Sequence, residues 1–405
     1  MKRRPTVLFV HYTFPGVVGG VETVVKHHAL GLAPLAEVGL MAGRGPVDVR
    51  GVPAVRIRLL DSLHPRISEV TGEIVRGDGS EAFAAVRRRI ASALQPHFAA
   101  ADRVVLHNVA TMSLNLPLVA ALHDLAPGLP DGRLIVWVHD LAVLRPDGMT
   151  LEDDDPRRLL SRPLPGARYV AVSEERRVAT ASALGLPPSS ILVVPNGVDI
   201  ARVLRLSRTT TALVERLGLS AADPLLVLPA RLVRRKRIEL AIDAARILRD
   251  RGQDARLVVT GGPDPHDRDG MAYLEELRAL VVANGSRDVL LVDEIGRSAD
   301  ERLVADLYAL ADALVYPSAS EGFGLPMLEA AVARLPIVCT DLPVLREVVG
   351  PAATFVPLDG GPTDFADGIE RALALAPAAG LAGRVRRKSD WHRIVAEQVV
   401  PAVLG

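Results

Sequence analysis

The chain alternates between short apolar runs and longer segments with a helical repeat. In the segment 238–250, apolar residues recur at the three- and four-residue spacing that places them on one face of a helix. Near-continuous apolar strands separated by helical segments are typical of parallel sheets covered by helices on both faces. The predicted strands are Val7–Val10, Val55–Leu59, Arg103–His107, Leu134–His139, Tyr169–Val172, Ile191–Val194, Leu225–Leu228, Arg256–Thr260, Val289–Val292, Ala313–Tyr316 and Pro336–Thr340.

A polar stretch near the middle of the chain divides this pattern. Residues 196–224 follow the last strand of the first half and end just before a new apolar run, which predicts a linker. Each side is long enough for one doubly wound domain. Near the end, the basic run Arg384–Lys388 predicts the solvated start of a last helix, whose apolar face packs. We therefore predict an α/β protein with two Rossmann-like domains, residues 1–203 and 204–385, and a C-terminal helix in 386–405.

Composition removes several classes of function. The 405 residues carry 48 basic and 48 acidic side chains, so the formal net charge is zero and no global field attracts nucleic acid. Cys339 is the single cysteine, which excludes an intrachain disulfide and a cysteine-based zinc site. No apolar run approaches the ~18 residues of a membrane span, and the apolar run Val7–Val10 is too short for a signal peptide. We expect a cytoplasmic protein without a nucleic-acid partner.

The segment 320–331 carries the most specific candidate chemistry. It follows a predicted strand and leads into a helix, with Gly322 and Gly324 in the loop. Glycines let a backbone approach a ligand, and the free N–H groups at a helix start suit a phosphate. Glu321 lies on the loop and Glu329 inside the helix, so we expect them to contact different parts of one ligand. The alternative is a plain turn with two surface carboxylates.

A basic segment follows the predicted strand Leu225–Leu228 and opens a helix. Arg231 and Lys236 lie beyond the carboxyl end of this strand, where doubly wound sheets bind ligands. Arginine grips a phosphate with two hydrogen bonds and lysine offers a compact charge. Basic charge at a helix N-terminus opposes the helix dipole, so this placement needs a counter-ion. The alternative is a solvated basic run.

The order Ser-Glu-Gly-Phe-Gly-Leu-Pro-Met-Leu-Glu in 320–329 resembles the Glu-x7-Glu signature of the retaining GT-B-fold glycosyltransferases of family 4. These enzymes use nucleotide-sugar donors. The resemblance implies that Glu321 lies beside the donor sugar, that Glu329 binds the ribose, and that backbone N–H groups between them hold the diphosphate. The residues that would supply these N–H groups are Phe323, Gly324 and Leu325.

Other segments carry the same resemblance. Residues 229–241 are similar to the family's Gly-Arg-Leu…Lys-Gly motif, which would place Arg231 and Lys236 on the diphosphate, although Ala230 and Arg237 stand where relatives usually have glycine. Thr260–Pro263 ends a strand where relatives bind the nucleotide, which implies that Gly261 and Gly262 line that site.

The N-terminal half resembles the family in its loops. Pro15–Glu22 is similar to the Gly-Gly-x-Glu loop, which implies that Gly19 and Gly20 face the donor diphosphate and the acceptor. Val136–Asp140 is similar to a strand ending in His-Asp, which implies a contact of His139 with the donor sugar. Four residues that follow or end other strands are predicted on the acceptor side: His11, His107, Asn108 and Ser173.

The resemblance implies a GT-B fold, with two facing Rossmann-like doubly wound domains, an interdomain cleft and a C-terminal helix that crosses back to the first domain. It implies a retaining hexosyltransferase that moves mannose or glucose from GDP-mannose or UDP-glucose to a hydroxyl acceptor. The predicted catalytic residues are His139, Arg231, Lys236 and Glu321. Two alternatives remain open: a non-catalytic nucleotide-sugar-binding partner, and another enzyme on this fold, such as a phosphorylase-like protein.

No tightly bound cofactor is expected, because the nucleotide diphosphate sugar is a co-substrate. We predict no metal site: Asp264, His266 and Asp267 lie in a polar loop, and Asp153–Asp155 reads as a solvated charge run.

The acceptor can be a small molecule, a lipid or a glycan, and the polar segment Asp61–Arg76 is expected to cover it as an irregular loop. Arg87–Arg89 on a predicted helix, 82–94, leave peripheral membrane contact open. The sequence does not decide between a monomer and a homodimer.

Overall fold

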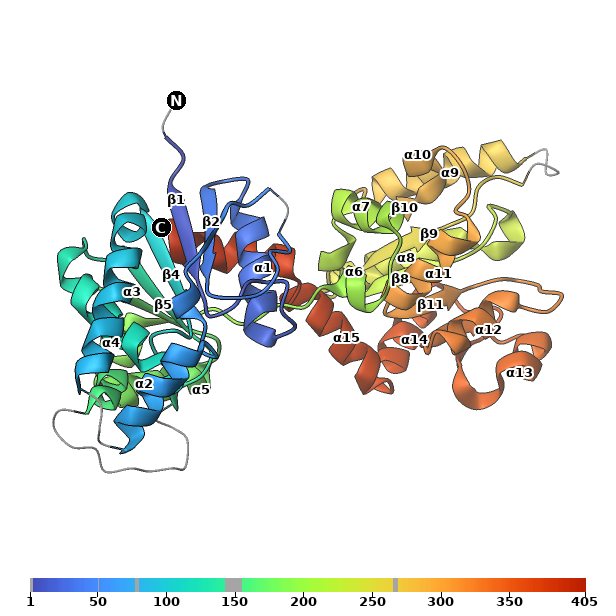
Figure 1. Cartoon of the computed structure of the whole chain (residues 1–405). Coiled ribbons are helices and arrows are strands. Elements are labelled where there is room, and N and C mark those ends of the chain that lie inside the picture. Colours follow the sequence, from blue (N-terminus) through green and yellow to red (C-terminus); the bar gives the residue numbers. More distant parts are fainter. Residues whose placement is uncertain (1–2, 50, 77–79, 143–154, 265–268) are drawn as a thin grey trace. The chain divides into compact units, whose positions relative to one another are not determined.

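The computed structural model describes residues 3–49, 51–76, 80–142, 155–264 and 269–405. The chain divides into two compact units (Figure 1): Met1–Gly197 together with Trp391–Gly405, and Val198–Asp390. Each unit contains one parallel sheet with helices packed against it, which confirms the predicted α/β class and the two Rossmann-like domains. Val198–Val203, predicted at the end of the first domain, lies in the second unit.

The first unit is built on a seven-stranded sheet with the order β3-β2-β1-β4-β5-β6-β7. Every neighbouring pair in this sheet is parallel. The strands are β1 Thr6–Val10, β2 Glu37–Ala42, β3 Ala54–Arg56, β4 Arg103–His107, β5 Leu134–Val138, β6 Arg168–Ala171 and β7 Ile191–Val193. The helices are α1 Gly20–Leu32, α2 Pro65–Arg76, α3 Ser80–Ala100, α4 Leu116–Leu125 and α5 Glu174–Leu184.

Both faces of this sheet are buried, which explains its apolar strands. In β5, Val136 and Val138 belong to one hydrophobic cluster, whereas Ile135 and Trp137 belong to a second cluster. Successive side chains of a strand point to opposite faces, so a strand covered on both sides is apolar at every position. The sequence pattern of the first half therefore follows directly from the two helical layers.

The C-terminal segment completes one of these layers. It consists of α16 (Trp391–Ile394), a π-helical turn (Val395–Val399) and α17 (Val400–Leu404). Trp391, Ile394 and Val395 share a hydrophobic cluster with Val24 and Val25 of α1. Figure 1 shows this red segment among the blue elements of the first unit.

The second unit is built on a six-stranded parallel sheet with the order β10-β9-β8-β11-β12-β13. The strands are β8 Leu225–Leu228, β9 Arg256–Val259, β10 Val289–Leu290, β11 Ala313–Tyr316, β12 Ile337–Thr340 and β13 Thr354–Val356. The helices are α6 Ile200–Val203, α7 Arg208–Leu217, α8 Ile238–Asp250, α9 Gly270–Ala283, α10 Leu291–Ile295, α11 Glu301–Leu310, α12 Leu325–Val332, α13 Pro343–Val349, α14 Pro362–Ala374 and α15 Pro377–Lys388.

Two predicted strands end early because a helical segment begins inside them. The predicted strand Val55–Leu59 ends at Arg56, because Arg58–Leu60 forms a 3-10 turn. The predicted strand Val289–Val292 ends at Leu290, where α10 begins. A short apolar run in a core has the same composition in a strand and in a buried helix, so its periodicity does not separate the two.

Two polar stretches contain more helix than predicted. Asp61–Arg76 was expected as an irregular loop, but α2 occupies most of it, and its Ile67 and Val70 are fully buried. The predicted linker 196–224 contains α6 and α7, and Leu213 of α7 packs into the core of the second unit.

The basic run Arg384–Lys388 also differs from its prediction. It ends α15 instead of starting the last helix, and Arg386 is buried. The Arg386 guanidinium is paired with Asp312 at 2.5 Å and donates hydrogen bonds to the carbonyls of Leu219 and Ala222. A partner distant in sequence thus compensates the buried charge, and the sequence pattern does not reveal it.

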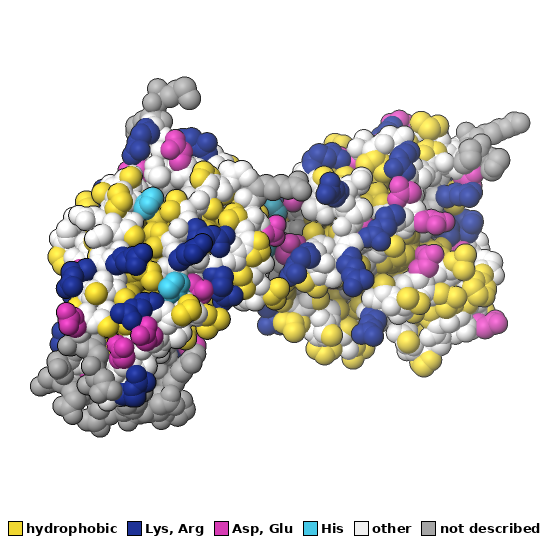
Figure 2. Space-filling model, in the orientation of Figure 1, with side chains coloured by type: hydrophobic (Ala, Val, Ile, Leu, Met, Phe, Trp, Pro, Cys, Tyr) yellow, Lys and Arg dark blue, Asp and Glu magenta, His cyan; other side chains and the backbone are white. Residues whose placement is uncertain are grey.

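The visible surface carries both signs of charge. Figure 2 shows Lys and Arg side chains interspersed with Asp and Glu on both units. This distribution matches the zero formal net charge of the chain. The predicted helix with Arg87–Arg89 is part of α3, and its apolar residues Phe83, Val86 and Ile90 are buried in the first unit.

Candidate functional site

The strand order places a ligand-binding position in the second unit. The order reverses between the neighbouring strands β8 and β11, whose following helices therefore cover opposite faces. In doubly wound sheets, ligands bind outside the carboxyl ends of the strands at such a switch point. β8 leads into the short 3-10 turn Arg234–Lys236, and β11 leads into the loop 317–324.

Lys236 and Glu321 form an ion pair at this position. The Lys236 ammonium donates hydrogen bonds to Glu321 Oε1 and to the Tyr316 hydroxyl, and lies 4.6 Å from the centroid of the Tyr316 ring. Ser318 Oγ donates a further hydrogen bond of 2.5 Å to Glu321 Oε1. The Lys236 and Glu321 side chains are only 9% and 8% exposed. Two predicted catalytic residues are thus brought together in a buried polar cluster.

Burial and pairing act in opposite directions on these two groups. Burial lowers the pKa of Lys236, and the neighbouring Glu321 carboxylate partly offsets this shift. Burial alone would raise the pKa of Glu321, but hydrogen bonds from Lys236 and Ser318 outweigh it and hold this pKa below its ordinary value. Glu321 is therefore a carboxylate at neutral pH, and it is the counter-ion that the basic helix start requires.

Arg231 and Glu329 have other partners. Arg231 is mostly exposed, and its guanidinium lies 3.3 Å from the carboxylate of Asp264. The Tyr308 hydroxyl donates a hydrogen bond of 2.9 Å to Glu329 on α12. The structure therefore does not bring Arg231 or Glu329 into direct contact with the Lys236–Glu321 pair.

The start of α12 has the features of an anion site. Gly324 precedes the helix with φ of 96°, in the left-handed region that favours glycine, and a Cβ there would lie 2.6 Å from Leu345. The first N–H groups of a helix have no intrahelical acceptor and point toward a ligand. Phe323 and Leu325 expose their side chains at 53% and 61%, so their predicted role rests on the backbone.

Gly261 and Gly262 follow β9 in tight surroundings. A Cβ on Gly261 would lie 2.0 Å from the carbonyl oxygen of Ala230, so a side chain there would displace the loop that follows β8. The Gly262 amide donates a hydrogen bond of 2.9 Å to Ser298 Oγ. Gly261 thus brings the loops after β8 and β9 together.

The first unit has its own switch point, between β1 and β4. His11 follows β1 and its Nδ1 is 2.9 Å from the carbonyl oxygen of His107, the last residue of β4. His107 Nδ1 is 3.0 Å from Nε2 of His139, which follows β5. Asn108 accepts a hydrogen bond of 2.8 Å from the His139 amide. These four predicted residues therefore form one connected group within the first unit.

Burial keeps two of these imidazoles neutral at pH 7. Burial, followed by the charge of His11, lowers the pKa of His139 to about 4. Burial also lowers the pKa of His107, which is fully enclosed. His139 can therefore donate or accept a hydrogen bond, but it does not present a positive charge to a ligand at neutral pH.

Ser173 is the N-cap residue of α5. Its hydroxyl accepts a hydrogen bond of 3.1 Å from the Arg176 amide and caps the N-terminus of α5. The predicted acceptor-side role of Ser173 remains a prediction beside this capping role.

Comparison with known proteins matches both halves of the chain. Residues 18–202 match the family described as Glycosyltransferase Family 4, and residues 210–381 match Glycosyl transferases group 1. The chain belongs to the family 4-like glycosyltransferases of the GT-B fold. The resemblance carried by the segments around Lys236 and Glu321 is thereby confirmed.

Individual members of this glycosyltransferase family match parts of the chain. A D-inositol 3-phosphate glycosyltransferase of Xylanimonas cellulosilytica is 31% identical over 258 residues, which are 58% of this chain and 59% of the relative. The serotype-specific mannosyltransferase WbdA of Escherichia coli is 40% identical over 75 residues, which are 18% of this chain and 9% of that protein. Among solved structures, sucrose-phosphate synthase from Thermosynechococcus elongatus is 18% identical with a TM-score of 0.40, and 98% of each chain is covered.

The sequence predicts no individual role for several residues that contact the predicted site residues. Tyr316 and Ser318 complete the surroundings of Lys236 and Glu321. In the first unit, Glu22 accepts a hydrogen bond from Thr13 and lies 3.6 Å from His11. Burial alone would raise the pKa of Glu22, but the hydrogen bonds from His11 and Thr13 outweigh it and lower the pKa to about 2.

The positions of two of these residues in the sequence could have indicated a role in the site. Tyr316 ends a predicted strand, and Glu22 is the last residue of the Gly-Gly-x-Glu loop. Their partners are set by the register between strands, which the sequence alone does not supply.

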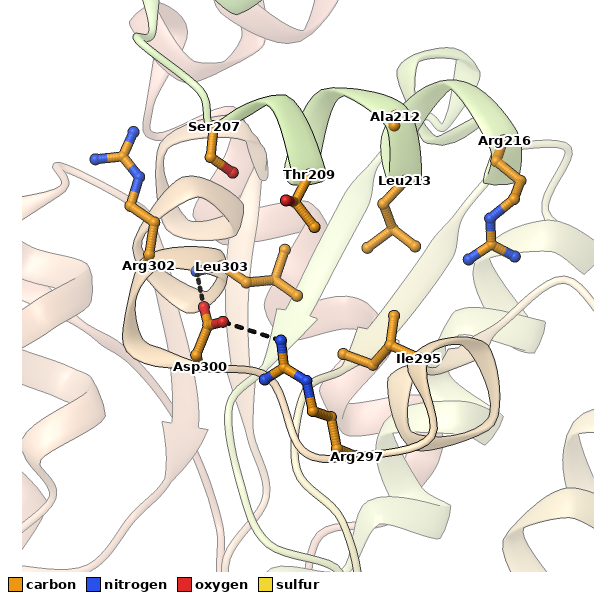
Figure 3. A pocket seen from close by; sticks show the side chains of 10 residues that line it. All are labelled: Ser207, Thr209, Ala212, Leu213, Arg216, Ile295, Arg297, Asp300, Arg302 and Leu303. Carbon is orange, nitrogen blue, oxygen red and sulfur yellow. Dashed lines mark hydrogen bonds and ion pairs between the residues drawn. The ribbon is translucent and has the colours of Figure 1, made fainter.

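A cavity of about 450 Å³ lies between α7 and the segment 295–303 of the second unit (Figure 3). Its arginines have acidic partners: Arg216 is 2.5 Å from Glu294, Arg297 is 3.2 Å from Asp300, and Arg302 is 3.0 Å from Asp306. None of the predicted site residues lines this cavity. It is therefore separate from the candidate site.

Within the described ranges, no three His, Cys, Asp or Glu side chains are grouped to hold a metal ion, and no helix is long and apolar enough to cross a membrane. His266, Asp267 and the residues 153–154 lie outside the described residues. Asp155, expected in a solvated run, instead caps a short 3-10 helix and pairs with Arg157.

Proposed function

We propose that this protein transfers a hexose, mannose or glucose, from a nucleotide diphosphate sugar to a hydroxyl acceptor with retention of configuration. The observation that carries this proposal is the buried Lys236–Glu321 pair at the switch point of the second unit, in a chain of the family 4-like glycosyltransferases. Fixed positive charge at a strand end stabilises a departing diphosphate, and a carboxylate beside it binds sugar hydroxyls.

The proposed reaction needs no covalent intermediate on the protein. The bond between the anomeric carbon and the diphosphate oxygen breaks, and the acceptor oxygen forms its bond on the same face of the sugar. The acceptor proton passes to the departing phosphate oxygen. Lys236 and Arg231 would stabilise the diphosphate charge, while Glu321 orients the sugar and Glu329 the ribose.

In the first unit, His139 is proposed to contact the donor sugar as a neutral hydrogen-bonding group. This role is supported by its place after β5 and by the burial that lowers its pKa to about 4. Gly19 is the N-cap residue of α1 and Gly20 is its first residue, so the two lie where helix N–H groups can face an anion. The acceptor side is proposed around His11, His107 and Asn108.

The relatives suggest the first substrates to test. The Escherichia coli relative is named a mannosyltransferase, which favours GDP-mannose among the donors. The Xylanimonas cellulosilytica relative is named for D-inositol 3-phosphate, which makes an inositol phosphate the first acceptor to try. The alignment spans 59% of that relative, so substrate and activity are proposed for this chain.

The proposal is tested by incubating purified protein with GDP-mannose or UDP-glucose and a panel of hydroxyl acceptors. We expect one donor to be consumed, with an α-linked product that retains the configuration of the donor sugar, as read by proton NMR. Turnover should continue in excess chelator, since we propose no metal requirement. A product of inverted configuration, or turnover abolished by chelator and restored by magnesium, would contradict these parts of the proposal.

A further inference from the structure

We propose that Arg237 is a positioning residue that holds Lys236 against Glu321. This inference rests on the proposed function, because Lys236 and Glu321 are assigned to the donor site there. Arg237 directly follows Lys236 and has a left-handed backbone conformation. Its backbone and its side chain contribute separately to the geometry of the pair.

The backbone of Arg237 retains the shape that a glycine would give. Its φ and ψ are 47° and 48°, in the left-handed region, which costs free energy for a residue with a side chain. The 3-10 turn Arg234–Lys236 ends at this residue, and α8 begins at the next one. The left-handed conformation therefore sets the angle between the turn that carries Lys236 and the helix.

The side chain of Arg237 connects the carboxyl ends of three neighbouring strands. Its Nε donates a hydrogen bond of 2.6 Å to the carbonyl of Pro317, which follows β11. Its two Nη atoms donate to Thr340 Oγ1, at the end of β12, and to the carbonyl of Leu358, beyond β13, at 3.0 and 2.8 Å. One planar guanidinium with donors in a fixed fork satisfies all three acceptors, and a shorter or neutral side chain does not.

These hydrogen bonds fix the loop that carries Glu321. Pro317 is the residue before Ser318, which itself donates to Glu321. The same loop is attached to the Lys236 turn on its other side, where the Ala319 amide donates 2.7 Å to the Arg235 carbonyl. The loop that carries Glu321 is thus held on one side by the Arg235 carbonyl and on the other by the Arg237 side chain. We call these hydrogen bonds the frame of the Lys236–Glu321 pair.

The frame can be tested without any substrate. Lys236 is one of four lysines in the chain, with Lys2, Lys26 and Lys388. Its side chain is 9% exposed, whereas that of Lys26 is 35% exposed. An amine-acetylating reagent followed by peptide mass spectrometry measures each lysine separately. In Arg237→Gly, we expect Lys236 to be acetylated about tenfold faster than in the wild type, with Lys26 unchanged as the internal reference.

A second variant probes the frame from a distance. Thr340→Val removes one of the three acceptors and leaves the Lys236 turn untouched. We expect it to accelerate acetylation of Lys236 about two- to threefold. Because Arg237→Gly already removes this hydrogen bond, the double variant should match Arg237→Gly alone.

A matched control comes from the opposite edge of the same sheet. Arg386 also donates to several carbonyls, but it lies beside the amino ends of β8 and β11. Arg386→Lys should lower the melting temperature and leave the acetylation rate of Lys236 unchanged. It should also leave the donor KM within about twofold of the wild-type value.

Kinetics connects the frame to the donor site. Arg237→Gly should raise the donor KM and lower kcat/KM by about 10- to 100-fold, the loss that a shift of about 1 Å produces at a site. Unchanged protection of Lys236 in Arg237→Gly would overturn the inference, as would acetylation that rises equally at Lys26. A wild-type protein that neither binds nor consumes any nucleotide sugar would overturn the proposed function. The acetylation experiment needs no nucleotide sugar, so it would still show whether Arg237 holds Lys236 in place.

Discussion

Lys236 and Glu321 are 85 residues apart in the sequence, yet the ammonium of one donates directly to the carboxylate of the other. Both side chains are buried, so each group compensates the charge of the other inside the second unit. The register between β8 and β11 creates this contact, because Leu226 and Val227 pair with Ala313 and Leu314. The sheet therefore sets both the position and the ionisation of the two groups.

Substitutions in this pair should change the stability of the protein and its transfer activity by different amounts. Lys236→Met leaves the Glu321 carboxylate buried without its main partner and should destabilise the protein by about 3–5 kcal/mol. Adding Glu321→Gln to Lys236→Met removes the stranded charge, so the double variant should recover much of this stability. Transfer should stay at least about 10²-fold below wild type in both variants and in Glu321→Gln alone. Denaturant unfolding and a transfer assay measure the two effects. Recovery of transfer in the double variant would contradict the assigned roles.

The first unit should lose stability in acid. Burial lowers the pKa of His28 to about 3, compared with an ordinary value of 6.5, and the rings of Trp137 and Trp391 lie against it. Between these values the unfolded chain binds a proton that the folded chain does not. The stability from neutral His28 is thus complete above pH 6.5 and is lost as pH falls toward 3, by up to about 1.4 kcal/mol per pH unit.

His28→Phe should remove this contribution, because phenylalanine has no proton to bind. Both tryptophans of the chain, Trp137 and Trp391, lie in the first unit, so their fluorescence follows its unfolding in urea. The wild type should lose more stability than His28→Phe between pH 7 and pH 5. Equal losses in the two proteins would contradict the burial argument.

The Ser173 hydroxyl that caps α5 should contribute measurably to stability. Ser173→Ala removes the hydroxyl that accepts from the Arg176 amide and should cost about 1 kcal/mol. Ser173→Asp keeps a capping oxygen and should retain the wild-type stability. Unfolding followed by tryptophan fluorescence measures both. If the alanine variant were as stable as the wild type, the capping role would be wrong.

The loop contact at Gly261 predicts an asymmetric response to alanine. Gly261→Ala places a methyl group 2.0 Å from the Ala230 carbonyl oxygen and should destabilise the second unit by about 1–3 kcal/mol. Gly380 lies in α15 with open space around its missing Cβ, so Gly380→Ala should stabilise by about 0.5–1 kcal/mol. Thermal unfolding compares the two, and a neutral Gly261→Ala would show that the loops are not in contact.

Much of the fold follows from the sequence because each strand is apolar on both faces. Arg103–His107, Leu225–Leu228 and Ala313–Tyr316 have the predicted bounds, and α8 occupies the predicted 238–250. The pattern missed β2, which contains Gly39 and begins with an exposed glutamate, and the three-residue β13. The three-residue β13 lies at the edge of its sheet and receives its identity from the neighbour it pairs with, and that information is not local.

The candidate site was predictable where a motif lies at a strand end. The positions of Lys236 and Glu321 after predicted strands predict that both contact a ligand. The structure brings their side chains into contact. The hydrogen bond from Arg237 to Pro317 was not predictable, because it joins two segments 80 residues apart through a backbone carbonyl. Such contacts depend on strand order and register, which only the folded chain defines.

The most direct test of the account is nucleotide binding measured by thermal shift, with wild type and Lys236→Met compared against GDP, UDP, ADP and their sugar conjugates. At a free ligand concentration about 100 times Kd, binding stabilises the native state by about 2.7 kcal/mol, which is a clear shift in Tm. We predict that one nucleotide family stabilises the wild type and that Lys236→Met loses most of this shift. A wild type that responds to none of the nucleotides, or a variant that responds equally, would contradict a nucleotide-sugar site built on Lys236 and Glu321.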